Sequence, residues 1–508
     1  MDNTRRAGVL LHPTSLPGAN GIGEFGDEAH RFVDWLAEGE QTIWQVMPLG
    51  PTGYGDSPYQ CFSAFAANPL LLSLDRLRDE GLLTPSDLEP LHQLPREFVD
   101  YGAVIPKKNE LLYLAFQAFS RDANIEQRAE FDQFKQRFQG WLDDYALFMA
   151  LKAFHDGQPW NNWPAELRDR DPEALKRITT ELHDRIEFQR WLQFKTFTQW
   201  WKVREHANSK GIKILGDLPI FVAYDSVDAW ANRDLFHFDE KGNPTVIAGV
   251  PPDYFSSTGQ RWGNPLYKWD AHRAQGFSWW EARLRATFEL VDIVRIDHFR
   301  GFDACWSIPA DEETAVNGEW VPAPGHELFR ALRDRMGEVN VVAENLGVIT
   351  KQVEDLRKAF GFPGMRVLQF AWDSGPGNVF LPHNHTTDSV VYTGTHDNNT
   401  TRGWLEQEST PDDLSYMKEY IGHDPGAIEQ ELIRLAFASP GVSAIVPMQD
   451  WLGLGTEGRM NTPGQAAGNW SWRVNHEHLN SGLAEHMGNF ARRYGRAPST
   501  WVDENETE

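Results

Sequence analysis

Short apolar runs rich in β-branched residues recur along the chain and alternate with segments whose apolar residues follow a helical period. Such runs are typical of strands buried on both faces, and their alternation with helices is typical of parallel βα units. Eight runs of this kind are present, at residues 8–12, 42–49, 213–220, 292–299, 340–346, 365–370, 389–397 and 443–450. The pattern predicts an α/β protein built on a (β/α)8 TIM barrel, whose active site lies at the C-terminal ends of the strands.

The numbers of residues between successive predicted strands are uneven, and the longest intervals predict insertions into the barrel. Residues 51–210 are far more than a crossover needs, and several of their segments have a helical period. One of these runs from Pro172 to Ala207, with Asp171 as its N-cap. We expect residues 1–508 to form a single catalytic barrel domain, with residues 51–210 as an inserted, largely helical subdomain and no separate C-terminal domain.

Residues 221–275 form a second insertion, which has little periodicity but is rich in glycine, proline and aromatic residues. Long segments of this kind inside a compact domain are often functional loops. We therefore expect an inserted loop region that belongs to the active site.

Composition and charge exclude several classes of protein. The 508 residues are 41% hydrophobic and 24% charged, which is typical of a globular protein. The formal net charge of −25 repels phosphate backbones and anionic lipid, so we expect neither nucleic acid nor a membrane as a partner. Only two cysteines, Cys61 and Cys305, are present, and we expect both to be reduced. The first apolar run is broken by His12 and Pro13, so it is too short for a signal peptide, and we expect a cytoplasmic protein.

Arg295 and Asp297 lie two residues apart in the run 292–299, so their side chains point to the same face of the predicted strand. An arginine beside a carboxylate keeps it ionised, as a nucleophile or a charge stabiliser requires. The alternative is an ion pair that only fills the mouth of the barrel, and these two residues alone do not decide between them.

Three more acidic residues, Asp217, Glu344 and Asp397, lie at predicted strand ends. Glu344 ends an apolar run, where burial raises a carboxyl pKa and favours a general acid, although a glutamate there can also pair with the following helix. Four carboxylates at one barrel mouth would repel one another unless cations or a substrate offset the repulsion. Glycoside cleavage requires two carboxyl groups in opposed settings, one ionised and one protonated. His298 and His396 could hydrogen-bond sugar hydroxyls.

A metal-dependent hydrolase is the competing interpretation, because His12, His298 and His396 could join the acids as ligands. We do not favour it, since the first run holds a single histidine and the one His-x-His pair, His383 and His385, lies in a proline-flanked loop. The chain also lacks a Walker loop, a strand-linked Gly-x-Gly-x-x-Gly segment and a Gly-x-Ser-x-Gly elbow. The sequence thus predicts no metal and no cofactor.

Taken in order, the segments GDLPIFV, VRIDHFRG, AENLG and GTHDNNTTRGW resemble the amylomaltases, the 4-α-glucanotransferases of the α-amylase superfamily. The likeness extends from about Arg6 to about Arg496 and includes GDSPYQ, RMNTPG and the stretch 249–267. This joint pattern is far more specific than any one of its short segments.

The resemblance implies Asp297 as the nucleophile, Glu344 as the acid/base and Asp397 as a third acid that holds the distorted donor sugar. It implies that the stretch 249–267 overhangs the cleft. Asn345 departs from the family, which more often carries aspartate there. Further residues are implied to surround the donor sugar or to line the donor and acceptor subsites: Arg295, His298, His396, Asp217, Tyr59, Gln260, Trp262, Asp373 and Asn461.

From the resemblance we expect a retaining transglycosylase acting on α-1,4-glucan oligosaccharides and polysaccharides, present as a monomer or a weak homo-oligomer. The carboxyl groups of Asp297 and Glu344 should then lie about 5 to 5.5 Å apart. Two rivals remain: an α-glucan hydrolase of the same superfamily, and a carbohydrate-binding barrel without activity.

Overall fold

The computed structural model describes residues 4–252 and 256–501. At its centre is a closed barrel whose strands follow one another in sequence order, all neighbours being parallel. The (β/α)8 TIM barrel prediction is confirmed, and each of the predicted runs overlaps a strand. The strands are β1 (Arg6–Leu10), β2 (Ile43–Gln45), β3 (Lys213–Pro219), β6 (Ile293–Asp297), β9 (Val341–Ala343), β10 (Gly364–Val367), β11 (Ser389–Tyr392) and β12 (Ser443–Pro447).

Several strands end earlier than the apolar runs that predicted them. The run 389–397 forms ladder pairs only as far as Tyr392. Beyond it, the Thr393 hydroxyl donates to Asp450 (2.5 Å), and the main-chain N–H and hydroxyl of Thr395 both donate to Asn398 Oδ1 (2.9 Å). Side-chain hydrogen bonds of this kind replace the ladder and turn the chain into a loop. The residues after Tyr392 are therefore free to form part of a site.

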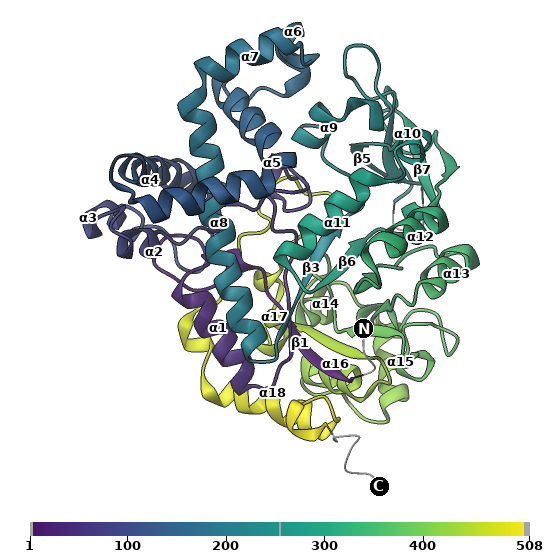
Figure 1. The fold of residues 1–508 in the computed structure, drawn as a ribbon. Helices are drawn as coiled ribbons and strands as arrows, with labels where there is room; N and C mark the ends of the chain where they lie inside the picture. The colour runs from purple at the N-terminus through teal and green to yellow at the C-terminus, as the bar shows by residue number, and fades with distance from the viewer. Residues whose placement is uncertain (1–3, 253–255, 502–508) are drawn as a thin grey trace.

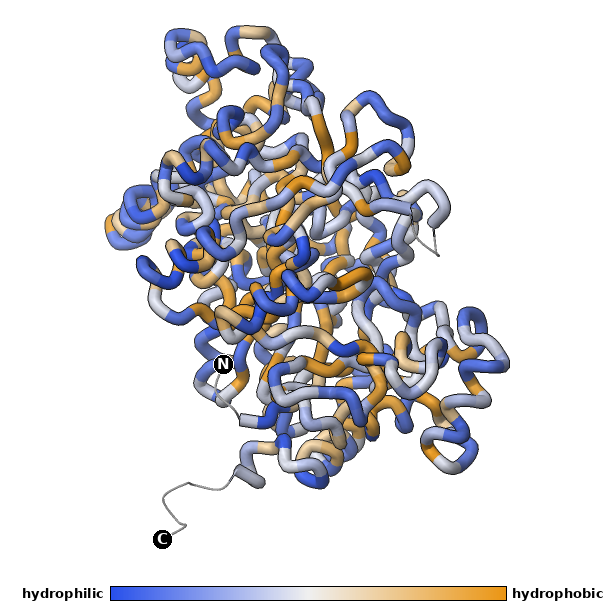
Figure 2. Tube along the Cα trace, turned by 90° about the vertical axis from the view of Figure 1, so that its right-hand side faces the viewer, coloured by the Kyte–Doolittle hydropathy of each residue, from blue (hydrophilic) through white to orange (hydrophobic). Residues whose placement is uncertain are grey.

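Helices surround the barrel, and the apolar residues gather inside while polar residues lie at the periphery (Figures 1 and 2). No α-helix forms in the described residues 368–388, where only 3-10 helices (Leu368–Phe370 and Pro382–Asn384) separate β10 from β11. The α-helices outside the two insertions are α1 (Asp27–Glu38), α11 (Ser278–Leu290), α12 (Gly325–Met336), α13 (Lys351–Ala359), α14 (Thr401–Gln407), α15 (Pro411–Ile421), α16 (Ile428–Ala438), α17 (Met448–Trp451) and α18 (Ser481–Arg493).

The segment between β2 and β3 is largely helical and rises at the upper left of Figure 1. Asp171 is the N-cap of α7, as predicted, and its carboxylate accepts from the Ala174 N–H (2.9 Å). The stretch from Pro172 to Ala207 is helical, but it forms two helices, because Leu182 (φ −96°, ψ 16°) interrupts it. Period alone hides the break, since Leu182 continues the apolar spacing. The helices are α2 (Leu74–Asp79), α3 (Pro85–Leu88), α4 (Tyr101–Asp122), α5 (Ile125–Phe154), α6 (Ala165–Arg168), α7 (Pro172–Glu181) and α8 (His183–Ser209).

The segment 221–275 is more regular than the loop that the sequence predicted, so that expectation is wrong in part. It contains α9 (Val227–Ala231), β4 (Val246–Val250), β5 (Gln260–Pro265) and α10 (Trp269–Ala274), and its residues 253–255 lie outside the described residues. The two strands join β7 (Ala304–Pro309) and β8 (Glu319–Pro322) in a second, antiparallel sheet of order β5-β4-β7-β8. β4 and β5 pair with each other, and β4 also pairs with β7 from a later part of the chain, a pairing that local periodicity does not reveal. The division of the chain at residues 51–210 and 221–275 stays a prediction.

Close packing at Gly216 on β3 gives the first test. A Cβ atom at Gly216 would lie 2.5 Å from Val291 Cγ1 and 3.0 Å from Cγ2. We expect Gly216→Ala to lower the free energy of unfolding by about 1 to 3 kcal/mol through overpacking. Gly140→Ala is the control, because a Cβ at this exposed position of α5 meets nothing within 4 Å, and alanine favours the helix by up to about 1 kcal/mol. Urea denaturation measures both, and a Gly216→Ala variant as stable as the wild type would contradict the packing argument.

Candidate active site

Two neighbouring barrel strands bring an arginine between two carboxylates. Asp217 on β3 and Arg295 on β6 are direct partners in the ladder, and Asp297 ends β6. The Arg295 guanidinium binds Asp217 Oδ2 through Nη1 (2.5 Å) and Asp297 Oδ1 through Nη2 (2.9 Å). The prediction that Arg295 and Asp297 share a face is confirmed. The Asp217 side chain is 1% exposed and that of Asp297 is 31% exposed, so Asp297 is the carboxylate that a ligand can reach.

The charges of this group depend on one another. Burial raises the pKa of Asp217, and the charge of Asp297 adds to this, while Arg295 acts in the opposite direction. Burial alone would lower the pKa of the Arg295 guanidinium, but Asp217 and Asp297 hold that pKa well above its usual value. Arg295 is therefore a fixed cation that keeps two carboxylates together at the barrel mouth.

Glu344 follows β9 and is held by main-chain groups. Its Oε2 accepts from the N–H of His298 (2.7 Å) and its Oε1 from the N–H of Leu346 (2.8 Å). Burial raises the pKa of Glu344 to about 7, with the charge of Asp297 as the second cause, whereas Arg295 and the two N–H donors act against the shift. The predicted rise is thus present, and a carboxyl group with such a pKa can donate a proton near neutral pH.

His298 turns the chain beneath Glu344. It has a φ of 51°, a left-handed conformation that is uncommon for residues other than glycine, and it precedes the 3-10 helix Phe299–Phe302. This conformation directs its N–H to the Glu344 carboxylate. Its ring Nε2 is buried and has no hydrogen-bond partner among the described residues. Strained backbone of this kind is often found at functional sites.

A second acidic group forms around Asp397, after β11. Its Oδ2 lies 3.3 Å from His396 Nε2, and its Oδ1 accepts from the Asn461 amide (2.6 Å). Burial alone would raise the pKa of Asp397, but His396, Asn461 and Arg295 lower it well below its usual value. Burial would likewise lower the pKa of His396, yet Asp397 raises it above the ordinary value. Asp397 therefore stays ionised, and its side chain is 48% exposed.

Tyr59 connects the two acidic groups. Its hydroxyl donates to Asp217 Oδ2 (2.9 Å) and lies 3.5 Å from His396 Nδ1. The Tyr59 and His396 rings are stacked with centroids 5.0 Å apart. A continuous chain of polar contacts thus runs from Asp297 through Arg295 to Asp397.

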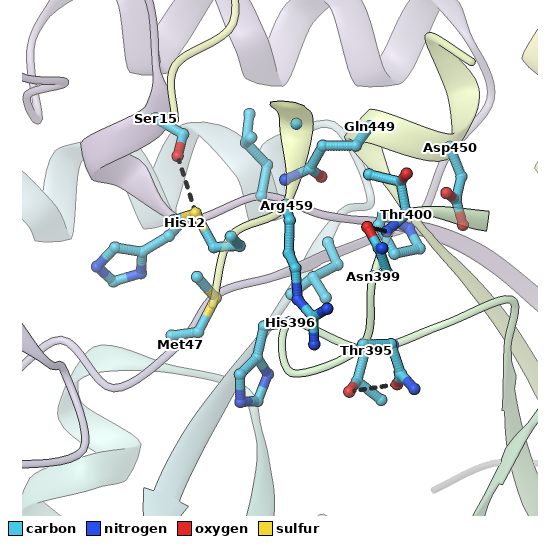
Figure 3. A pocket seen from close by; sticks show the side chains of 16 residues that line it. His12, Ser15, Met47, Thr395, His396, Asn399, Thr400, Gln449, Asp450 and Arg459 are labelled. Atoms are coloured by element: carbon cyan, nitrogen blue, oxygen red, sulfur yellow. Dashed lines mark hydrogen bonds between the residues drawn. The ribbon is translucent and has the colours of Figure 1, made fainter. Parts of the chain in front are cut away.

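A small cavity of about 20 Å³ lies behind His396 (Figure 3). His12 and Arg459 line it together with His396. Burial lowers the pKa of His12 to about 3, and the neighbouring His396 adds to this effect, so His12 is neutral. Because its ring is buried and neutral, His12 supplies no charge to offset the carboxylates. In the part of the chain that the structure describes, no group of three or more His, Cys, Asp or Glu side chains is arranged to hold a metal ion.

The second sheet reaches the site through Trp262 on β5. Its ring meets the His298 ring edge-on, with centroids 4.8 Å apart and an interplanar angle of 89°. The Trp262 indole N–H donates to Gln260 Oε1 (3.1 Å). Asp373 is not brought into contact with either acidic group; its carboxylate accepts from Asn378 (3.1 Å) in an exposed segment after β10.

Asn345, next to Glu344, makes two hydrogen bonds that an ionised aspartate could not both make. Its amide donates to Glu354 Oε1 (2.6 Å), and its Oδ1 accepts from the N–H of Met365 (2.7 Å). Asn345 is buried and ties the end of β9 to β10 and α13. An aspartate could not donate to Glu354 and would place a second carboxylate beside it.

Three contributors were missed by sequence reasoning. Met365 Sδ lies 3.4 Å from Arg295 Nε, and the Trp470 ring lies against both Tyr59 and His396. Arg459 donates to the main-chain carbonyls of Asp397 and Asn461. For Arg459 a signal existed in the RMNTPG segment, whereas Met365 and Trp470 carry no local pattern that points to a site.

Comparisons with known proteins agree on one family. A family model described as 4-alpha-glucanotransferase matches residues 11–479. The 4-alpha-glucanotransferase of Synechocystis is 50% identical over 500 residues, which cover 98% of this chain and 99% of that protein. The chain belongs to the 4-alpha-glucanotransferase family. The predicted family, its enzymatic character and its barrel fold are confirmed.

Further members support this assignment. The 4-alpha-glucanotransferase of Thermus thermophilus is 50% identical over 482 residues, which cover 93% of this chain and 95% of that protein. The structure of an amylomaltase from Streptococcus agalactiae in complex with acarbose has a TM-score of 0.94 at 38% identity and covers 97% of this chain and 100% of its own. Among residues 4–252 and 256–501, no helix is long and apolar enough to cross a bilayer.

The buried position of Arg295 gives the second test. We expect Arg295→Met to lower the free energy of unfolding by about 3 to 5 kcal/mol at pH 7, because it leaves the buried Asp217 carboxylate without its cation. The loss should shrink as the pH falls towards about 4, since Asp217, whose folded-state pKa is raised, then takes up a proton.

Asp297→Ala is the matched control for this test. It removes the partly exposed partner and leaves the Asp217–Arg295 pair intact, so the change should stay below about 1 kcal/mol. Denaturant unfolding at several pH values measures both variants. A loss for Arg295→Met that does not vary with pH would contradict the role given to Asp217.

Proposed function

We propose that this protein is a retaining 4-α-glucanotransferase, which transfers α-1,4-glucan segments from a donor to the 4-hydroxyl of an acceptor glucan or glucose. The observation that carries the proposal is the pair formed by Asp297, a reachable carboxylate held by Arg295, and Glu344, a carboxyl group with a pKa of about 7. One ionised and one protonated carboxyl group are what the reaction needs.

In the first step, Glu344 protonates the glycosidic oxygen and Asp297 attacks the anomeric carbon. The bond to the leaving glucan breaks, and an ester bond to Asp297 forms. Asp397, half exposed and ionised, would hold the hydroxyls of the distorted donor sugar together with His298 and His396. The position of Trp262 against His298 supports a place for it in the sugar-binding cleft, with Gln260 beside it.

In the second step, ionised Glu344 accepts the proton of the acceptor 4-hydroxyl, whose oxygen displaces Asp297 from the anomeric carbon. Transfer prevails over hydrolysis only where the site favours an acceptor sugar and excludes water. We assign this task to the segment 249–267, with Trp262 contacting the site. Tyr59, Asp217 and Asn461 support the acids, and Asp373 would act farther along a bound glucan.

The partners that follow from this proposal are α-1,4-glucan oligosaccharides and polysaccharides. The proposed reaction needs no metal and no cofactor, since both proton transfers and the covalent step use Asp297 and Glu344 alone. A monomer or weak homo-oligomer in the cytoplasm stays a prediction.

Incubation with maltotriose alone tests the proposed function. We expect glucose and a ladder of longer maltooligosaccharides, with the total of reducing ends unchanged, because every bond broken is replaced by a new one. Separation by size together with a reducing-end assay measures both quantities. A steady rise in reducing ends would identify a hydrolase, and intact maltotriose with measurable binding would identify a sugar-binding barrel; either result would refute the proposal.

The pKa of Glu344 predicts how the activity depends on pH. Glu344 must be protonated to act as the acid, so kcat/KM for maltotriose should fall as the pH rises through about 7. The control substrate is α-maltosyl fluoride, because fluoride leaves without protonation and its kcat/KM should show no such fall.

Two variants complete the pH test. Glu344→Ala should retain the first step with α-maltosyl fluoride, measured as release of fluoride, and lose activity on maltotriose. Its second step should be slow with either substrate, because Glu344 is also the base. Asp297→Ala should lose both reactions, since it removes the attacking atom. Equal alkaline limbs for the two substrates would argue against Glu344 as the acid, and residual transfer by Asp297→Ala would argue against Asp297 as the nucleophile.

A further inference from the structure

The side chain of Arg459 joins three separate segments around Asp397. Its Nη2 donates to the main-chain oxygen of Asp397 (3.0 Å), its Nε to the main-chain oxygen of Asn461 (2.8 Å), and its Nη1 to Glu408 Oε1 (2.7 Å). All three nitrogens of the guanidinium are thus in use, and the side chain is 18% exposed. Figure 3 shows it extending toward the loop that carries Thr395 and His396.

Two of the residues that Arg459 contacts, Asp397 and Asn461, also form a hydrogen bond with each other. Asn461 Nδ2 donates to Asp397 Oδ1 (2.6 Å), so Asp397 and Asn461 are joined once through their side chains and once through their main chains by Arg459. Asp397 lies on a loop beyond β11, and its side chain is 48% exposed. A carboxylate on a loop keeps one orientation only where other groups fix it.

We propose that Arg459 is a positioning residue for the transfer reaction, which aligns the Asn461 main chain with that of Asp397 so that their side-chain bond forms. The inference rests on the proposed function, in which Asp397 holds the donor sugar. Glu408, bound to Nη1, fixes the guanidinium on the side away from these two carbonyls. Arg459 makes none of its contacts with the side chains of Asp297 or Glu344, so it acts through Asp397 alone.

An arginine suits this place and a lysine does not. The planar guanidinium presents donors in fixed directions and can reach three acceptors at once, whereas an ammonium group is a single point on a flexible stem. The loss of alignment should therefore appear in the lysine variant although the positive charge is kept.

The test measures kcat and KM for maltotriose transfer in Arg459→Lys and Arg459→Gln. We expect kcat to fall about 10- to 100-fold in both, with little change in KM, because misplacing a group by a fraction of an ångström to one ångström costs a factor of this size. The control is Arg402→Lys, which alters the pair between the partly exposed Arg402 of α14 and the buried Glu429 of α16 and should leave kcat unchanged. Thermal unfolding shows whether each variant is folded. If the glutamine variant does not fold, the lysine variant alone provides the test.

A double-mutant cycle with Asn461→Ala separates positioning from a general structural role. If Arg459 acts through the Asn461–Asp397 bond, the double variant should be no slower than the slower single variant. Losses of kcat that multiply would overturn the proposal, and so would Arg459 variants with full kcat.

The wild type in the same assay distinguishes the two levels of the argument. A wild type that does not redistribute maltotriose would refute the proposed function and this inference with it. A wild type that does, beside fully active Arg459 variants, would refute the role of Arg459 alone.

Discussion

The site depends on one electrostatic constraint: an ionised carboxylate whose side chain is 1% exposed requires a cation or several hydrogen-bond donors beside it. Asp217 meets this requirement through Arg295, whose second nitrogen then holds Asp297 at the barrel mouth. Because Asp217 and Arg295 are direct ladder partners on β3 and β6, the barrel backbone itself sets this geometry. The positions of these three side chains therefore follow from the barrel strands, whereas Glu344 and Asp397 lie beyond the ends of their strands.

The two other acids are driven in opposite directions by their surroundings. Glu344 is buried near Asp297, so its pKa rises to about 7 in spite of two main-chain donors. Asp397 has His396 and Asn461 as direct partners, so its pKa falls well below the usual value. Identical chemical groups thus have opposite pKa shifts within one barrel mouth. The difference arises from partners supplied by β6, by the loop after β11 and by the segment around Asn461, which are far apart in the sequence.

The sequence predicts the features that local pattern encodes. The eight barrel runs, the shared face of Arg295 and Asp297 and the raised pKa of Glu344 all follow from spacing and burial within a few residues. The sheet formed by β4, β5, β7 and β8 was missed, because its strands show little periodicity and the pairing of β4 with β7 joins distant parts of the chain. The break at Leu182 was missed because Leu182 continues the apolar spacing, and the three-way contact of Arg459 was missed because its acceptors are not neighbours in the sequence. Asp373 shows the converse, since the resemblance implied a place for it in a subsite but its described contacts lie outside the acidic groups.

In the proposed reaction the coupling between Asp297 and Glu344 has a direction. The charge of Asp297 is one cause of the raised pKa of Glu344, so Glu344 retains its proton while Asp297 is ionised. Once Asp297 forms an ester, that charge is gone and the pKa of Glu344 must fall, which favours the ionised form that the second step requires as a base. When the ester bond to Asp297 breaks, the carboxylate regains its charge and the pKa of Glu344 rises again. The change from acid to base therefore needs no movement of either side chain, only the making and breaking of the bond to Asp297.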